Sequence, residues 1–305
     1  MSKENTAVTK KKIKRCKEDV VFDAACFIIL TLVLFVVAYP LYWVIISSIS
    51  APSAVSSGKV LLHPIGFTLK GYAEVFKNDQ VMRGFLNSLI ITFCGVMVNL
   101  IVTLPTSYAL SRSNFSGKKP ITIFYLITMF FGGGLIPTFI IINNWFHLLD
   151  TFTVMVLPFS VIAYYIIVSR TFFQSSLPAE LWDAAQIDGC GNLRYFFTIV
   201  LPLSKAIISV IALWAAVGHW NSYFNALIYL RTADRYPLQL VMRNILINNE
   251  VVSNAMTGSA AAELNRKANL IKYGAIVVSS LPIMCMYPFV QKYFNQGVMI
   301  GALKG

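Results

Sequence analysis

Charged residues are scarce in this sequence. Asp, Glu, Lys and Arg make up 12% of its 305 residues, whereas hydrophobic residues make up 57%, and the mean hydropathy is +0.67. A soluble domain carries about 25% charged residues, so this composition excludes an ordinary globular surface. The sequence therefore predicts an integral membrane protein.

The motifs of common enzymes are absent as well. Without a Gly-x-x-x-x-Gly-Lys-Ser/Thr loop, the chain itself is not expected to cradle ATP phosphates. His-Glu-x-x-His, Gly-x-Ser-x-Gly and a clustered carboxylate pair are missing, so catalysis has no candidate residues. The few cysteines are too far apart to suggest a disulfide framework or a metal site: Cys16, Cys26, Cys94, Cys190 and Cys285. We expect a protein that is not an enzyme and holds no cofactor in this chain.

The net charge of +12 is a feature that nucleic-acid-binding proteins share. Here the basic residues lie in the N-terminal arm and in loops, and no folded basic domain carries them. An excess of Lys and Arg on one side of a membrane explains this distribution better. We therefore expect membrane lipid, and no nucleic acid, as a partner.

Long apolar runs fill most of the chain, and each reaches the ~20 residues that cross ~30 Å of hydrocarbon. The sequence predicts an all-α integral membrane protein whose six spans lie near 22–49, 85–110, 121–142, 153–173, 206–230 and 270–290. A basic arm (1–21) precedes this membrane domain (22–290), a polar loop (174–204) interrupts it, and a tail (291–305) follows it.

Six spans place both termini on the same side of the membrane. That side holds 15 of the 25 Lys and Arg residues, including the cluster at Lys10–Lys17. Because positive charge favours the cytoplasmic side, we expect a multi-pass protein of the cell membrane with both termini in the cytoplasm. The first apolar run is too long for a cleaved signal peptide, whose apolar core spans about 7–15 residues.

Two stretches within the apolar runs are candidates for function. Gly132-Gly133-Gly134, followed by Pro137, predicts a broken helix, either as a kink for close packing or as a bend lining a solute pathway. In the fifth run, amides and aromatic side chains lie close together, as sugar binding requires. The candidate solute contacts are Trp220, Asn221, Tyr223 and Asn225, and hydrogen bonding between helices is the competing interpretation.

The polar loop predicts a short helix outside the bilayer. Pro178 is suited to open it, and Gly189 or Gly191 to close it. Ala184 and Ala185 are small enough to admit another surface. For the later polar segment 231–269, a solvated connector and a docking surface are both open interpretations.

The run from Asp183 to Gly189, with Val200-Leu201-Pro202 downstream, resembles the EAA loop of ABC importer permeases, although Asp183 stands where that family usually has Glu. In that family the loop is a coupling helix that sits in a cleft of the ATPase subunit. The resemblance implies the type I importer permease fold and these ATPase-coupling residues: Glu180, Asp183, Ala184, Ala185, Asp188 and Gly189.

The resemblance extends to sugar-importer permeases of the maltose-transporter G-subunit type, LplC-like branch, through Trp220-Asn221, Ala226-Leu227-Ile228 and the C-terminal run. It implies a bacterial carbohydrate importer, most specifically for an oligosaccharide, with a homologous second permease. It also implies two ATPases that bind ATP and Mg²⁺, and an extracytoplasmic solute-binding protein. Three tail residues would make a second ATPase contact: Asn295, Gly297 and Gly301.

Two alternatives to an ATP-driven carbohydrate importer differ from it in the solute or in the source of energy. An ABC importer permease for a polyamine or glycerol phosphate would share the same loop. An ion-coupled secondary transporter would need buried ionisable residues and repeated broken helices, but apart from Asp23, Arg170 and Lys272 near their ends, the spans hold only the neutral His219. The sequence therefore favours the carbohydrate importer.

Overall fold

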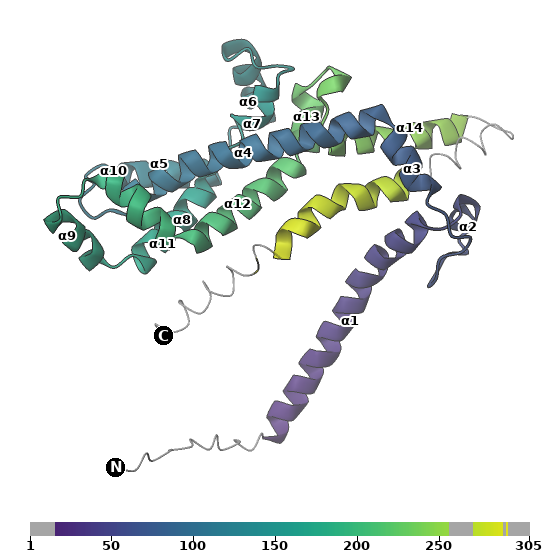
Figure 1. Cartoon of the computed structure of the whole chain (residues 1–305), viewed down its shortest axis with the longest axis horizontal. Coiled ribbons are helices and arrows are strands. Elements are labelled where there is room, and N and C mark those ends of the chain that lie inside the picture. The colour runs from purple at the N-terminus through teal and green to yellow at the C-terminus, as the bar shows by residue number, and fades with distance from the viewer. Residues whose placement is uncertain (1–15, 256–270, 289–290, 292–305) are drawn as a thin grey trace.

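The computed structural model describes residues 16–255, 271–288 and 291, and every regular element within them is helical (Figure 1). In chain order the elements are α1 (Lys17–Ser48), α2 (Pro52–Ser56), α3 (Lys70–Lys77), α4 (Asp79–Ser111), α5 (Lys118–Phe130), α6 (Leu135–Ile140), η1 (Ile141–Trp145), α7 (Phe152–Val156), α8 (Ala163–Ser176), α9 (Ala179–Ile187), α10 (Asn192–Tyr195), η2 (Phe196–Val200), α11 (Leu201–Leu203), α12 (Lys205–Trp220), α13 (Tyr223–Tyr229), η3 (Ala233–Arg235) and α14 (Leu238–Ala255). The last helix of the described residues covers Ile271–Pro288.

Helix α4 is the axis of the bundle, and α8, α12 and α14 pack along it. Its buried face carries small polar residues, among them Ser88, Asn99, Thr103 and Ser107, all fully buried. Small residues let helices approach closely in a membrane, where apolar side chains alone give little drive to associate. The Asn99 side-chain amide also donates to the Ser160 carbonyl at 2.7 Å, which fixes α4 against the segment before α8.

Helix α1 diverges from this bundle in Figure 1. Only its C-terminal end packs, where Trp43 donates to the Val60 carbonyl at 2.8 Å and Ile46 is buried beside Val55. Most of its apolar side chains from Val20 to Ile45 are exposed. A 32-residue helix is about 48 Å long, so it is long enough to cross a bilayer, where lipid would surround these side chains.

Three helices among the described residues are long and apolar enough to span a membrane: α1, α4 and Ile271–Pro288. Two bent pairs raise the number to five if each counts as one span. The first joins Lys118–Phe130 to Leu135–Trp145 at 112°, and the second joins Asn192–Leu203 to Lys205–Trp220 at 81°. The expected count of six spans stays a prediction.

The break predicted at the glycine triplet is present. Helix α5 ends at Phe130, α6 begins at Leu135, and Gly134 between them has a φ of +81°. Such a φ is readily available only to glycine, and Pro137 lies in the first turn of α6, where its missing N–H leaves no donor unpaired. The triplet therefore bends the chain sharply at this point.

Two other predicted spans are not continuous helices. Within 153–173 the helix is interrupted between α7 and α8, over 157–162, where Pro158 has no backbone N–H to continue the hydrogen bonds of α7. Within 206–230 the helix stops at Asn221 and Ser222. There the Asn221 amide donates to the Val217 carbonyl at 3.0 Å, and the Ser222 hydroxyl to the His219 carbonyl at 2.7 Å. These side chains compete with the helical backbone hydrogen bonds.

The segment 231–269 is more than a solvated connector in its first half. Leu238, Val241 and Met242 of α14 are buried against Ala275 of the last helix. The Leu238 backbone N–H donates to the Ser88 hydroxyl of α4 at 2.8 Å. The start of α14 is thus part of the helical bundle.

Candidate functional site

The candidate site is the short helix α9, whose ends are capped as its sequence predicts. Pro178 is its N-cap, and Gly189 follows its C-cap with a φ of +72°. The Cys190 N–H donates to the Ala185 carbonyl at 2.9 Å, and the Gly189 N–H to the Gln186 carbonyl at 3.0 Å. This pair of bonds is a Schellman motif, which satisfies the last carbonyls of the helix. The helix is therefore a closed unit held by local interactions.

The two faces of α9 have different environments. Glu180, Asp183 and Ala184 are exposed, and Ile187 is 87% exposed; these positions share one face at helical spacing. Ala185 was expected, with Ala184, to admit another surface. In the structure Ala185 is buried in this chain's own core, so Ala184 is the small residue left on the outer face.

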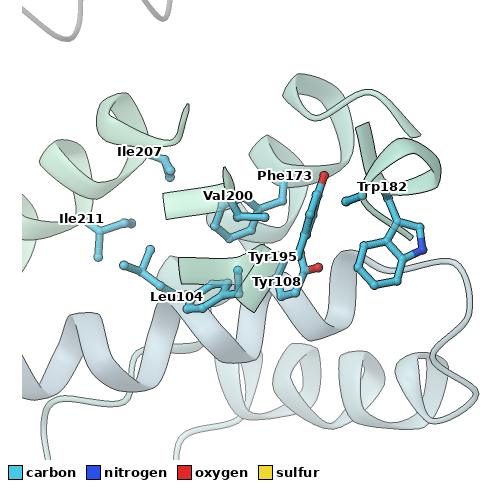
Figure 2. Close-up of a cluster of buried hydrophobic side chains, with 10 residues drawn as sticks. Leu104, Tyr108, Phe173, Trp182, Tyr195, Val200, Ile207 and Ile211 are labelled. Atoms are coloured by element: carbon cyan, nitrogen blue, oxygen red, sulfur yellow. The ribbon is translucent and has the colours of Figure 1, made fainter. Parts of the chain in front are cut away.

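The buried face of α9 belongs to an aromatic cluster, shown in Figure 2. Trp182 meets Tyr195 edge-on with ring centroids 5.0 Å apart. Tyr108 of α4 lies 5.2 Å from the Phe196 ring and 6.2 Å from that of Phe173 in α8. Since aromatic pairs contribute beyond their buried area, this cluster joins α9 firmly to α4 and α8.

Arg112 completes the cluster from the C-terminal end of α4. Its guanidinium carbon lies 4.2 Å from the Trp182 ring centroid, 5.8 Å from that of Tyr108 and 6.0 Å from that of Tyr195. A cation over an aromatic face is attracted by the ring quadrupole. The sequence did not predict a role for Arg112, because its position shortly after an apolar run indicates only a charged loop residue.

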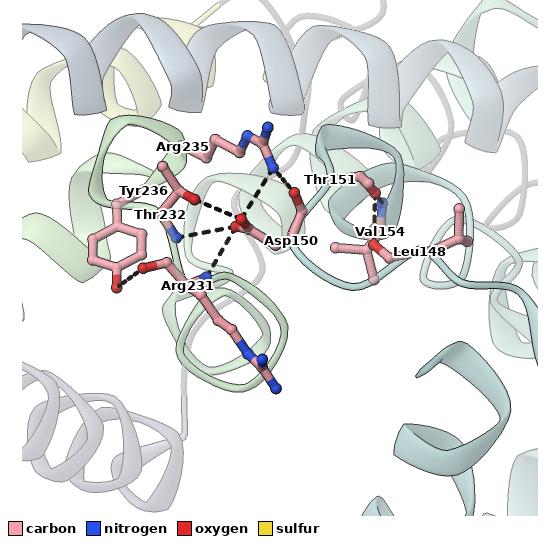
Figure 3. A network of polar contacts seen from close by, with 8 residues as sticks. All are labelled: Leu148, Asp150, Thr151, Val154, Arg231, Thr232, Arg235 and Tyr236. Atoms are coloured by element: carbon pink, nitrogen blue, oxygen red, sulfur yellow. Dashed lines mark hydrogen bonds and ion pairs between the residues drawn. The ribbon is translucent and has the colours of Figure 1, made fainter. Parts of the chain in front are cut away.

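A second polar arrangement lies near the N-terminal half of α4 (Figure 3) and is named here the Asp150 network: Asp150, Arg231, Thr232 and Arg235. The Asp150 carboxylate accepts from the Thr232 hydroxyl at 2.5 Å and from the Arg231 backbone N–H at 3.0 Å. Arg235 pairs with it at 3.1 Å. These hydrogen bonds, chiefly the one from Thr232, lower the pKa of Asp150 to about 2. The network ties the segment after η1 to the segment before η3.

The predicted solute contacts separate into three environments. Trp220 is 2% exposed, and its indole N–H donates to the Ser279 carbonyl at 2.9 Å. Asn221 and Tyr223 line one hollow of about 550 Å³. Asn225 lines another, of about 370 Å³, together with His219. The structure thus brings Asn221 and Tyr223 together, while Trp220 lines neither hollow. The tail residues Asn295, Gly297 and Gly301 lie outside the described residues.

The fold and the site together define a class of protein: a helical membrane bundle that carries a capped polar helix with one face free. No model of a protein family matches the chain. Individual proteins do match it. The chain is 35% identical to the polygalacturonan/rhamnogalacturonan transport system permease protein YtcP of Bacillus subtilis (strain 168), over 93% of this chain and 98% of that protein.

Two further similarities agree with this one. The chain is 34% identical to protein LplC of Bacillus subtilis (strain 168), over 93% of this chain and 95% of that protein. It also superposes with a TM-score of 0.82 on a chain of a bacterial ABC transporter that imports the acidic polysaccharide alginate, at 28% identity over 92% of this chain and 99% of that chain. The chain belongs to the permease subunits of carbohydrate ABC importers, which are transport components and not enzymes. The resemblance seen in the sequence is confirmed.

Proposed function

We propose that this chain forms half of the membrane pathway of an oligosaccharide importer and receives the energy of ATP hydrolysis through α9. The observation that carries the proposal is the division of α9 into two faces. Trp182 and Ala185 are buried in the chain's own aromatic cluster, whereas Glu180, Asp183 and Ile187 are exposed. A helix fixed on one side and free on the other is suited to pass on the movement of a partner.

The path of that movement runs from α9 into α4. Trp182 contacts Tyr195, and Arg112 at the end of α4 covers the Trp182 ring. Helix α4 then extends for 33 residues beside α8, α12 and α14. Because packed interiors resist local deformation, displacement of α9 would shift the whole of α4 rather than one side chain.

The free face of α9 indicates what its partner must offer. Asp183 and Glu180 present negative charge, while Ile187 is apolar and 87% exposed, as is Leu193 of the following helix α10 at 77%. An apolar cleft with a basic rim would complement this surface. We assign the role to two ABC ATPase subunits that bind ATP and Mg²⁺, with Ala184, Asp188 and Gly189 completing the contact.

The remaining partners and the orientation follow from the same assignment. Six membrane crossings would place α9 and both termini in the cytoplasm, and would place the Asp150 network on the outer side. A solute-binding protein would dock at that outer side, and a homologous second permease would form the other half of the pathway. The exposed amides and aromatic rings beside the helix break at Asn221 offer hydroxyl partners and a stacking surface to a sugar.

The test is transport by the complete importer reconstituted in vesicles. Gly189→Arg in this chain should abolish ATP-driven uptake while the solute-binding protein still loads with sugar, because the helix end would no longer fit its partner. Retained ATP-coupled uptake would contradict the proposal. Uptake that survives ATP depletion and stops with an ionophore would instead support an ion-coupled transporter.

A further inference from the structure

The hollow of about 550 Å³ beside the helix break is built by three separate elements. Helix α14 contributes one complete face, with positions three and four apart: Gln239, Met242, Arg243, Leu246 and Ile247. The adjoining face of α14, with Leu238, Val241 and Ile245, packs into the bundle core, and Met242 lies at the boundary between the two faces. The polar side chains of α14 in the hollow are therefore held in place by a buried apolar face behind them.

The other walls are also fixed. Ile276, Ser279 and Ser280 come from one face of the last helix, and Asn221 and Tyr223 come from the break between α12 and α13. The hydrogen bond from Trp220 to the Ser279 carbonyl, 2.9 Å long, ties the break to the last helix. Since tertiary contacts hold all three elements, the hollow is formed before any ligand arrives.

Arg243 is the one cationic side chain in the lining of this hollow. It is half-buried, and within the part of the chain whose side chains the structure describes, which leaves out 248–270, no carboxylate forms an ion pair with it. Arginine keeps its charge under all physiological conditions and offers five donors in a planar fork that matches a carboxylate. A charged side chain that is half-buried beside apolar residues is costly unless it is hydrated or paired with an opposite charge. A half-buried arginine in a preformed hollow favours the binding of an anionic ligand.

We propose that this hollow binds a sugar unit that carries a carboxylate, a uronate, within a transported oligosaccharide. The Arg243 guanidinium holds the carboxylate through two parallel hydrogen bonds. The Tyr223 ring, 43% exposed, stacks on the C–H face of the sugar, and the amides of Gln239 and Asn221 meet its hydroxyls. The volume lies within the range of about 300–1,000 Å³ of ligand sites. The inference rests on the proposed function and names the class of its substrate.

The test uses the complete importer in vesicles, with trigalacturonate and its fully methyl-esterified form as probes. The ester keeps the sugar ring and the chain length but removes the negative charges. Arg243→Gln should reduce uptake of the acid about tenfold or more and leave uptake of the ester within about twofold. Arg243→Lys should recover part of the loss, since it keeps the charge without the fork. The matched control is Arg231→Gln, which should not discriminate between the probes. Arg231 is exposed, and its only bond in the Asp150 network comes from its backbone, so the substitution leaves that bond in place.

Each contrary outcome has a distinct meaning. If the wild type takes up the ester but not the acid, or if Arg243→Gln affects both equally, the uronate site is overturned and the importer stands. An equal effect that occurs only in vesicles with anionic lipid would assign Arg243 to a lipid headgroup instead. If the wild type takes up neither probe and no neutral oligosaccharide, the proposed function is overturned together with this inference.

Discussion

The guanidinium carbon of Arg112 lies 4.2 Å from the ring centroid of Trp182. This contact joins the C-cap of the long helix α4 to the inner face of α9, the proposed coupling helix. The same cation also lies over Tyr108 and Tyr195, so three aromatic rings and one charge meet at a single junction. Movement of α9 relative to α4 would have to break this junction.

Arg112→Ala should loosen the link between ATP hydrolysis and transport. Losing the cation–π contacts costs about 0.5–2 kcal/mol, which is small enough for the chain to stay folded. We expect fewer sugar molecules imported per ATP hydrolysed, measured by parallel uptake and phosphate-release assays. Lys119→Ala removes an exposed cation from the first turn of α5 and should leave the ratio unchanged. An unchanged ratio in Arg112→Ala would show that the junction does not transmit motion.

The loss of stability on substituting Gly189 should depend on how readily the new residue adopts a positive φ, and not on the size of its side chain. Its φ is +72°, and an added Cβ would meet no atom within 4 Å. A left-handed conformation costs an L-residue about 1–2 kcal/mol, least for Asn. Thermal unfolding in detergent should rank Gly189→Asn as milder than Gly189→Ala, and Gly189→Val as the most severe. Gly191→Ala, at a φ of −74°, is the control and should be nearly neutral; equal losses at both glycines would refute the argument.

Gly95 of α4 lies directly against His219 of α12. A Cβ at position 95 would lie 2.4 Å from ring atoms of His219, and that ring is 6% exposed. Gly95→Ala should therefore destabilise the fold by about 1–3 kcal/mol through overpacking. Adding His219→Ala removes the obstructing ring, so Gly95→Ala should cost clearly less in that background. A double-mutant cycle of unfolding free energies measures this coupling, and strict additivity would contradict it.

The Asp150 network should weaken in acid. Folding lowers the pKa of Asp150 from 3.8 to about 2, so its ionised form stabilises the folded state above about pH 4. That contribution is lost as the pH falls toward 2. Between pH 5 and pH 2.5, the thermal midpoint of the wild type should fall further than that of Asp150→Asn, which has no carboxylate to protonate. Equal falls would show that the network has no influence on stability.

The position of α9 could be predicted from the sequence because its determinants are local. Pro178 limits where the helix starts, and Gly189 supplies the backbone conformation that ends it. The same reasoning predicts the break at Gly134. In each case one or two residues have conformational limits that hold in any tertiary setting.

The features that sequence reasoning missed depend on neighbours distant along the chain. An apolar run through Asn221 fits a continuous helix equally well, until its amide bonds the Val217 carbonyl. Nothing near Arg112 in sequence indicates that Trp182, on another helix, lies beneath its guanidinium. Likewise, Arg243 looks like a loop charge until the apolar face of α14 docks on the last helix. Such pairings arise from packing, which periodicity does not encode.

The most direct test is a photo-crosslink from the exposed face of α9. A photoreactive amino acid at Ile187, which is 87% exposed, should crosslink to the ATPase subunit in membranes that hold the whole importer. The same probe at Leu62, 69% exposed in the segment after α2, should not. Capture of the ATPase from position 187 alone is the predicted result. A probe at Ile187 that never reaches the ATPase, or that reaches the solute-binding protein on the opposite side of the membrane, would contradict the account.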